Sequence, residues 1–134
     1  ADELERMLQR HRGLSVVLDH CMYPKGSEGL TGETIRRVLD LARYPNLHPK
    51  LTWLVDSSGE DYPFADTHPL LRAVVEAYGP DRCVWGSDFP CDLWTPKASY
   101  GQHIRLFTES LGLSDDALEA ILWRTPERLW FRER

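Results

Sequence analysis

The sequence lacks several features that would assign a protein to a class at once. No apolar run approaches the roughly 18 residues that a membrane-spanning helix needs. The 16 basic and 21 acidic residues give a formal net charge of −5, so the sequence has no excess of basic residues that would indicate nucleic-acid binding. Internal repeats and low-complexity segments are absent too. We therefore expect a globular protein whose partners are neither nucleic acid nor membrane.

Paired cysteines are also absent. The three cysteines, Cys21, Cys83 and Cys91, form no CxxC motif. An odd number of cysteines without the spacing of a disulfide framework predicts reduced thiols and a cytoplasmic location. No obvious base accompanies Cys21 or Cys91, which favours space-filling residues in a pocket wall over nucleophiles.

What the sequence does have is a regular alternation of segment types. Apolar, β-branched runs predict strands over residues 14–18, 51–55 and 82–85. Helical spacing of apolar residues predicts helices over residues 2–12, 31–42, 66–78, 99–111 and 114–123. Strands that are separated by helices predict right-handed crossovers and a parallel sheet, and hence a single α/β domain over residues 1–134.

Polar residues follow each predicted strand at the same end. They are Asp19 and His20, then Asp56 and Glu60, then Ser87 and Asp88. Neighbouring parallel strands lie about 4.8 Å apart, so these side chains can converge on one pocket. Imidazole and carboxylate groups suit metal-assisted activation of water, which makes His20 and Asp88 the candidate site. The alternative is a strand-end histidine bonded to a carbonyl and an aspartate that caps a turn.

The remaining candidates are interpreted as structural. Asp19 is interpreted as a supporting or turn residue, and Asp56 as a solvated loop acid. Packing or surface roles are expected for the other histidines, which are His11, His48, His68 and His103. We place His48 in the connection before the second strand.

One long segment resembles a known family. YPFADTHPLLRAVVEAYGPDRCVWGSDFP, residues 62–90, is similar to the C-terminal signature of the amidohydrolase-related TIM-barrel proteins. These include metal-dependent hydrolases, decarboxylases of the aminocarboxymuconate semialdehyde type and pyrone-dicarboxylate lactonases. The VVLDH and GSDFP segments resemble the family's sixth and eighth strands, and ILWRTPERLWF resembles its closing helix.

The resemblance implies roles for the two candidate residues. Asp88 would bind a divalent metal, act as general base, or both, and His20 would bind the metal or polarise the substrate carbonyl. Zinc is the usual ion in the family, although some relatives work without one. The candidate substrate-pocket residues are Tyr23, Lys25, Glu60, Cys91 and Trp94.

The chain also departs from the family pattern. A TIM barrel typically needs about 250 residues and eight strands, whereas this chain has 134 residues and no HxH motif. The resemblance therefore implies the last three βα units of a barrel, completed by a missing N-terminal segment or by a homo-oligomer partner. Such cover would protect an open sheet edge and inner-face residues such as Val17, Trp53 and Val84. Ser57 stands where lactonase relatives carry an arginine, which disfavours a dicarboxylate lactone.

Two functions follow from these observations. The first is the C-terminal part of a metal-dependent enzyme that uses metal-activated water on a small organic substrate, by C–N or ester hydrolysis or by decarboxylation. The second is a catalytically inactive, truncated barrel that acts as a packing or oligomerisation module.

Overall fold

Short helices surround a small parallel sheet. The computed structural model describes residues 2–92 and 96–131. The α-helices are α1 (Asp2–Arg10), α2 (Glu33–Asp40), α3 (Leu54–Ser57), α4 (His68–Tyr78), α5 (Tyr100–Arg105) and α6 (Asp115–Glu119), and the strands are β1 (Val16–Leu18) and β2 (Leu47–Pro49). Short 3₁₀ turns cover Asp19–Met22, Gly26–Thr31, Leu41–Arg43, Ala65–Thr67 and Pro80–Arg82, and π-helical turns cover Leu106–Ser110, Ala120–Arg124 and Glu127–Phe131. No helix in the described part of the chain is long and apolar enough to cross a membrane.

The sheet is parallel, as the alternation of segments predicts. β1 pairs with β2, with Val16 opposite Leu47. Beyond β2, Lys50 forms a parallel bridge with Val84. The Lys50 amide donates to the Leu18 carbonyl at 3.0 Å, and the Leu51 amide donates to the Val84 carbonyl at 2.8 Å. The β2 segment therefore lies between β1 and the Val84 segment, and all three run in the same direction.

The second strand is not where the sequence suggests. The predicted strand over residues 51–55 is wrong, because β2 is Leu47–Pro49 and α3 begins at Leu54. Pro49 is the reason: proline lacks the amide hydrogen, so it argues against a central strand. Here it joins the ladder through its carbonyl, which accepts from the Val84 amide at 3.0 Å. His48 is correspondingly a strand residue and is only 6% exposed.

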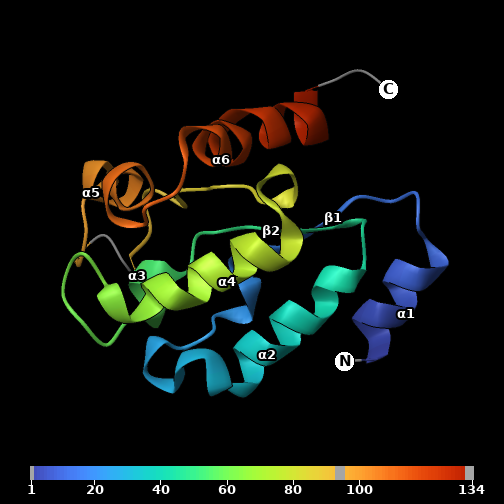
Figure 1. The fold of residues 1–134 in the computed structure, drawn as a ribbon, viewed down its shortest axis with the longest axis horizontal. Coiled ribbons are helices and arrows are strands. Elements are labelled where there is room, and N and C mark those ends of the chain that lie inside the picture. The colour runs from blue at the N-terminus through green and yellow to red at the C-terminus, as the bar shows by residue number, and fades with distance from the viewer. Residues whose placement is uncertain (1, 93–95, 132–134) are drawn as a thin grey trace.

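Helices cover both sides of this sheet. Figure 1 shows α2 and α4 on one side of the strands. On the other side lie α6 and the π-helical turns that follow it, which we call the C-terminal helical segment. The Tyr78 hydroxyl in α4 donates to the Val38 carbonyl in α2 at 2.8 Å. The Arg82 guanidinium donates to three carbonyls, those of Ala42, Tyr44 and Tyr78. These hydrogen bonds connect α2 and α4 to the start of the third parallel segment, which contains Val84.

The helix starts agree only in part with the sequence. Ser114, the first residue of the helix predicted over residues 114–123, caps α6, because its side chain accepts a hydrogen bond from the Ala117 amide. Asp66, at the start of the helix predicted over residues 66–78, does not cap α4. Its carboxylate instead accepts hydrogen bonds from the Ser58 hydroxyl and the Gly59 amide, so it fixes the loop after α3.

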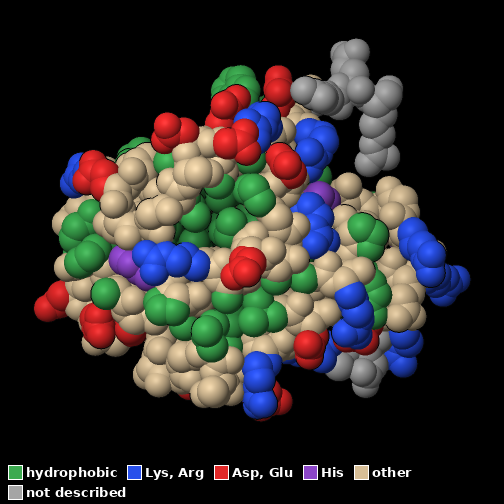
Figure 2. All heavy atoms as spheres, in the orientation of Figure 1, with side chains coloured by type: hydrophobic (Ala, Val, Ile, Leu, Met, Phe, Trp, Pro, Cys, Tyr) green, Lys and Arg blue, Asp and Glu red, His purple; other side chains and the backbone are tan. Residues whose placement is uncertain are grey.

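The inner-face residues are better covered than the sequence suggests. Trp53 and Val84 are completely buried within this chain, whereas Val17 is half-buried. Trp53 is buried because it lies in the turn before α3 and not in a strand. Apolar side chains nevertheless reach the surface between α4 and the C-terminal helical segment (Figure 2). That segment also carries three exposed aromatic residues, Trp123, Trp130 and Phe131.

Candidate functional site

Four charged or polar side chains meet beyond the carboxyl ends of the parallel segments. The Lys50 Nζ atom lies 2.6 Å from Asp88 Oδ1 and 2.9 Å from Asp19 Oδ1. The other oxygen of each aspartate, Oδ2, lies 3.2 Å from His20 Nε2. We call this closed arrangement of Asp19, His20, Lys50 and Asp88 the charge ring. It joins His20 and Asp88, the pair that the sequence predicts to share one site.

The backbone around the charge ring is held in an uncommon conformation. His20, Cys21, Met22 and Tyr23 all have φ between 48° and 59°, and Asp88 has φ of 50°. Left-handed backbone costs a non-glycine residue about 1–2 kcal/mol. Such residues persist only where their surroundings hold them, and they cluster at functional sites. Here the left-handed turn lets two successive residues, Asp19 and His20, contribute to one ring.

Lys50 reaches the ring from the middle of the sheet. It follows β2 directly, between Asp19 after β1 and Asp88 after the Val84 segment. A Cβ atom on Gly86 would meet Lys50 Cε at 2.6 Å, which is closer than real contacts allow. The glycine therefore leaves the space through which the lysine stem passes.

The ring favours a charged lysine. Burial by itself would lower the pKa of Lys50, but its hydrogen bonds to Asp88 and Asp19 outweigh burial and raise that pKa. Ionised pairs of this kind make the stronger protein hydrogen bonds. Lys50 is a site residue that sequence reasoning missed, because Pro49 concealed the strand that delivers it.

The imidazole of His20 is held on several sides. Its ring stacks on Tyr23, with centroids 4.7 Å apart and planes 14° from parallel. Its Nε2 atom faces the two carboxylates, while its Nδ1 atom is buried without a hydrogen-bond partner in the described part of the chain. In the neutral imidazole the proton then belongs on Nε2, where acceptors lie. His20 is thus placed to donate a hydrogen bond from Nε2.

Asp56 belongs beside the ring and is not a fully solvated acid. It lies in α3 and is partly buried. Burial raises its pKa, nearby Lys97 and His20 work against that rise, and Asp88 adds to it. The interpretation of Asp56 as a solvated loop acid is therefore wrong. Asp56 lies in a helix and not in a loop, near enough to Asp88 for that carboxylate to affect its pKa.

The predicted pocket residues are divided by the structure. Burial and then the charges of Asp56, Asp88, Asp19 and Cys91 raise the pKa of Tyr23, so Tyr23 and Cys91 share the surroundings of the ring. Lys25 and Glu60 are exposed, and no hydrogen bond or ion pair joins either of them to the ring within residues 2–92 and 96–131. Trp94 lies outside the described residues.

The ring does not resemble a metal ligand shell. Among the described residues, no group of three or more His, Cys, Asp or Glu side chains is arranged to hold a metal ion. The Lys50 ammonium lies against one oxygen of each aspartate, and His20 Nε2 lies against the other. The oxygen atoms that a zinc ion would need within about 2.2 Å are already engaged. Zinc would need further ligands and a displaced Lys50.

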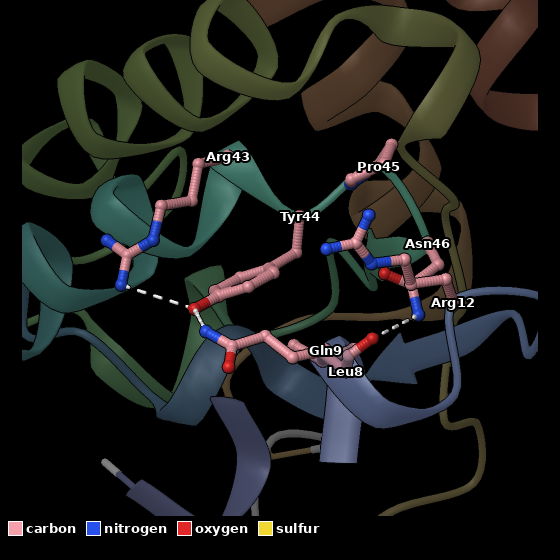
Figure 3. Close-up of a pocket in the computed structure, with 7 residues that line it drawn as sticks. All are labelled: Leu8, Gln9, Arg12, Arg43, Tyr44, Pro45 and Asn46. Atoms are coloured by element: carbon pink, nitrogen blue, oxygen red, sulfur yellow. Dashed lines mark hydrogen bonds between the residues drawn. The ribbon is translucent and has the colours of Figure 1, made fainter. Parts of the chain in front are cut away.

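A separate hollow lies at the opposite end of the strands. It has a volume of about 380 Å³ and is bounded by Gln9, Arg12, Arg43, Tyr44 and Asn46, with Leu8 and Pro45 (Figure 3). We call it the amino-end hollow, because Asn46 immediately precedes β2. A three-residue strand spans about 10 Å, so this hollow and the charge ring are different sites.

Comparison with known proteins places these features in context. The family model described as amidohydrolase matches residues 2–132. D-galactarolactone isomerase of Agrobacterium fabrum is 33% identical over 131 residues, which cover 96% of this chain and 44% of that protein. L-fucono-1,5-lactonase of Burkholderia ambifaria is 33% identical over 82 residues, which cover 61% of this chain and 28% of that protein.

A solved structure agrees with the fold. An amidohydrolase of Burkholderia multivorans with bound zinc superposes with a TM-score of 0.78 at 27% identity, over 93% of this chain and 46% of that protein. The chain thus spans less than half the length of these relatives. That share agrees with the C-terminal part of a TIM barrel.

Proposed function

Because this chain belongs to the amidohydrolase family, we propose that it supplies the C-terminal part of an enzyme that hydrolyses a small cyclic ester. Asp88 acts as the base and His20 polarises the carbonyl. The 3.2 Å approach of His20 Nε2 to Asp88 Oδ2 at the carboxyl end of the sheet carries the proposal. The names of two relatives, a lactonase and a lactone isomerase, favour a lactone over an amide or a carboxylic acid that loses carbon dioxide.

The reaction can be written with these side chains. Asp88 accepts a proton from water while the water oxygen bonds to the lactone carbonyl carbon. The His20 Nε2 hydrogen stabilises the negative charge that develops on the carbonyl oxygen. The ring C–O bond then breaks, and the proton held by Asp88 passes to the departing oxygen, which yields a hydroxy acid. Tyr23 supports the imidazole by stacking, and Cys91 lines the same region as a space-filling residue.

A divalent ion fits this chain's residues poorly. His20 and Asp88 could supply at most part of a zinc shell, and Asp88 would have to leave Lys50. We therefore assign no step to a metal. The bound zinc belongs to the Burkholderia multivorans relative.

The rest of the cleft comes from another polypeptide segment in this proposal. The chain covers 44% of the isomerase, and β1 has no strand on its outer edge in the part of the chain that the structure describes. A missing N-terminal barrel segment or a homo-oligomer partner would pair with that edge. Cys21 and Cys83 are buried, free thiols, which favours the cytoplasm as the location.

A non-catalytic role is the second candidate. The outer edge of β1, unpaired within the described residues, favours a packing or oligomerisation module, because such an edge can pair with another strand. The two candidates differ in what the complete protein does to a lactone. Hydrolysis by the complete protein supports the enzyme, whereas a complete protein without hydrolysis supports the module.

The decisive variant is Asp88→Asn in the complete protein. Asparagine keeps the size of the side chain but cannot accept the proton, so we expect turnover of a sugar lactone to fall about 100- to 10,000-fold. Acid release at constant pH measures turnover, and a thermal melt checks folding. Asp115→Asn, an exposed change in the first turn of α6, is the matched control and should leave turnover unchanged. Normal hydrolysis by folded Asp88→Asn protein would refute the assignment.

A further inference from the structure

We propose that the Lys50 ammonium is the resident cation of the charge ring and stands where a divalent ion would otherwise bind the two aspartates. The inference rests on the proposed function in taking the charge ring as the active site. It goes beyond that function by assigning a positioning residue and by predicting how the site treats metal ions.

The first support is the contact pattern. Nζ lies 2.6 Å from one oxygen of Asp88 and 2.9 Å from one oxygen of Asp19. An ion bound by both aspartates through these oxygens would have to occupy the space of the ammonium. The remaining oxygens, Asp19 Oδ2 and Asp88 Oδ2, each lie 3.2 Å from His20 Nε2.

The second support is that the position of Lys50 is built into the fold. Its amide donates to the Leu18 carbonyl, and its backbone bridges to Val84, so it is fixed from both neighbouring segments. Its side chain is 20% exposed, and Gly86 provides the space beside its Cε atom. A surface lysine that happened to meet an acid would need none of these features.

The third support is the charge balance. Asp19 and Asp88 carry two negative charges, and Lys50 with a neutral His20 carries one positive charge. The formal net charge of the four side chains is therefore −1 when the imidazole is counted as neutral. A zinc ion added to the complete ring would make the net charge +1 and would place a dication beside an ammonium, which repels it.

The ring therefore gains a metal site when Lys50 is removed. Lys50→Met keeps the length of the side chain without its charge, and Lys50→Arg keeps the charge. In the complete protein, washed with a chelator and titrated with Zn²⁺ by calorimetry, we expect Lys50→Met to bind zinc about tenfold or more tightly than wild type. Lys50→Arg should behave as wild type, and the double variant with His20→Gln should lose the gain.

A second measurement keeps the test independent of how Lys50→Met folds. Zinc should not raise the melting temperature of the wild-type protein through the ring, so its effect should be the same in wild type and Asp88→Asn. Zinc that wild type retains through the wash and that Asp88→Asn loses would overturn the inference. So would equal zinc affinity of folded Lys50→Met and wild type.

The zinc-binding test of Lys50 and the turnover test of the proposed function can fail independently. Zinc bound by wild type, together with turnover lost in Asp88→Asn, would overturn the role of Lys50 and leave the lactonase proposal in place. Tighter zinc binding by Lys50→Met in a protein that hydrolyses no lactone would support the resident cation and refute the catalytic proposal.

Discussion

The two ends of the parallel segments use polar side chains in opposite ways. At the carboxyl end, four side chains of the charge ring satisfy one another, and their backbone lies partly in the left-handed region. At the amino end, Asn46 instead donates to three backbone carbonyls, those of Leu8, His11 and Leu14. Side chains that bond mainly to each other can be redirected toward a substrate. A side chain bonded to the backbone serves to hold the fold together.

The two ends also differ in how their arginine and lysine residues are paired. Arg43, which lines the amino-end hollow, has an exposed side chain that pairs with Glu5 at 3.0 Å. Lys50 is far less exposed and is flanked by two carboxylates. Exposed pairs contribute little to stability or orientation. The comparison predicts that changes at the carboxyl end alter turnover and that changes at the amino end alter stability.

Among the variants that test this comparison, Gly86→Ala should cause the largest change, a loss of turnover. The added Cβ would meet Lys50 Cε at 2.6 Å, so the end of the lysine side chain must shift from its position between Asp19 and Asp88. Misplacement of catalytic groups by about 1 Å can cost about 100-fold in rate, and we expect a fall of that order in lactone turnover. Gly13→Ala is the control, since nothing lies within 4 Å of its added Cβ. Unchanged turnover in Gly86→Ala would show that the position of Lys50 does not matter.

Asn46→Ala should give the reverse pattern. Removal of its amide leaves the carbonyls of Leu8, His11 and Leu14 without that donor. Loss of a buried hydrogen-bond partner costs about 1–3 kcal/mol, so the free energy of unfolding should fall by that amount in denaturant titration. Turnover per folded molecule should equal that of wild type. A loss of turnover comparable to that of Gly86→Ala would erase the distinction between the two ends.

The smallest expected effect is the contribution of His48 to the stability of the fold at acidic pH. Burial lowers the pKa of His48, partly offset by its hydrogen bond to the Arg82 carbonyl at 3.2 Å. The folded state therefore binds this proton less readily than the unfolded state, whose value is about 6.5. The contribution to stability is complete above pH 6.5 and is lost as the pH falls below it.

Thermal melts across this range measure the contribution of His48. His48→Asn can still donate to the Arg82 carbonyl but does not titrate, so its stability should depend less on pH between about 6.5 and 5 than that of wild type. The rate of lactone hydrolysis should keep its pH profile. An identical pH dependence of stability in the two proteins would contradict the role assigned to His48.

The sequence predicted the central pair of the site but not its partners. His20 and Asp88 were predictable, because the carboxyl ends of parallel strands converge regardless of the exact strand bounds. Lys50 was not, since a proline at position 49 argues against a central strand. Asp19 is interpreted from the sequence as a supporting or turn residue, and in the structure it contacts both His20 and Lys50. The φ of 52° at His20 is a backbone conformation that the sequence does not indicate.

The same physical limits explain which parts of the fold could be predicted from the sequence. The parallel α/β arrangement was predictable from alternating segments, and its family from residues 62–90, and both are confirmed. The apolar residues 51–55 were misassigned because a short buried run has no periodicity that separates strand from helix. The helix predicted over residues 99–111 forms as α5 followed by a π-helical turn over Leu106–Ser110. Helical spacing of apolar residues does not distinguish those two forms.

The direction of β1 determines where a completing segment can deliver its side chains. Parallel strands run the same way, so a strand added at the outer edge of β1 would end beside Asp19. The Asp19 side chain is 62% exposed, whereas that of Asp88 is 27% exposed. A polar residue that follows the added strand would therefore meet the most accessible carboxylate first. The direction of a three-residue strand thus determines which of the two aspartates a polar residue after a parallel neighbouring strand would contact.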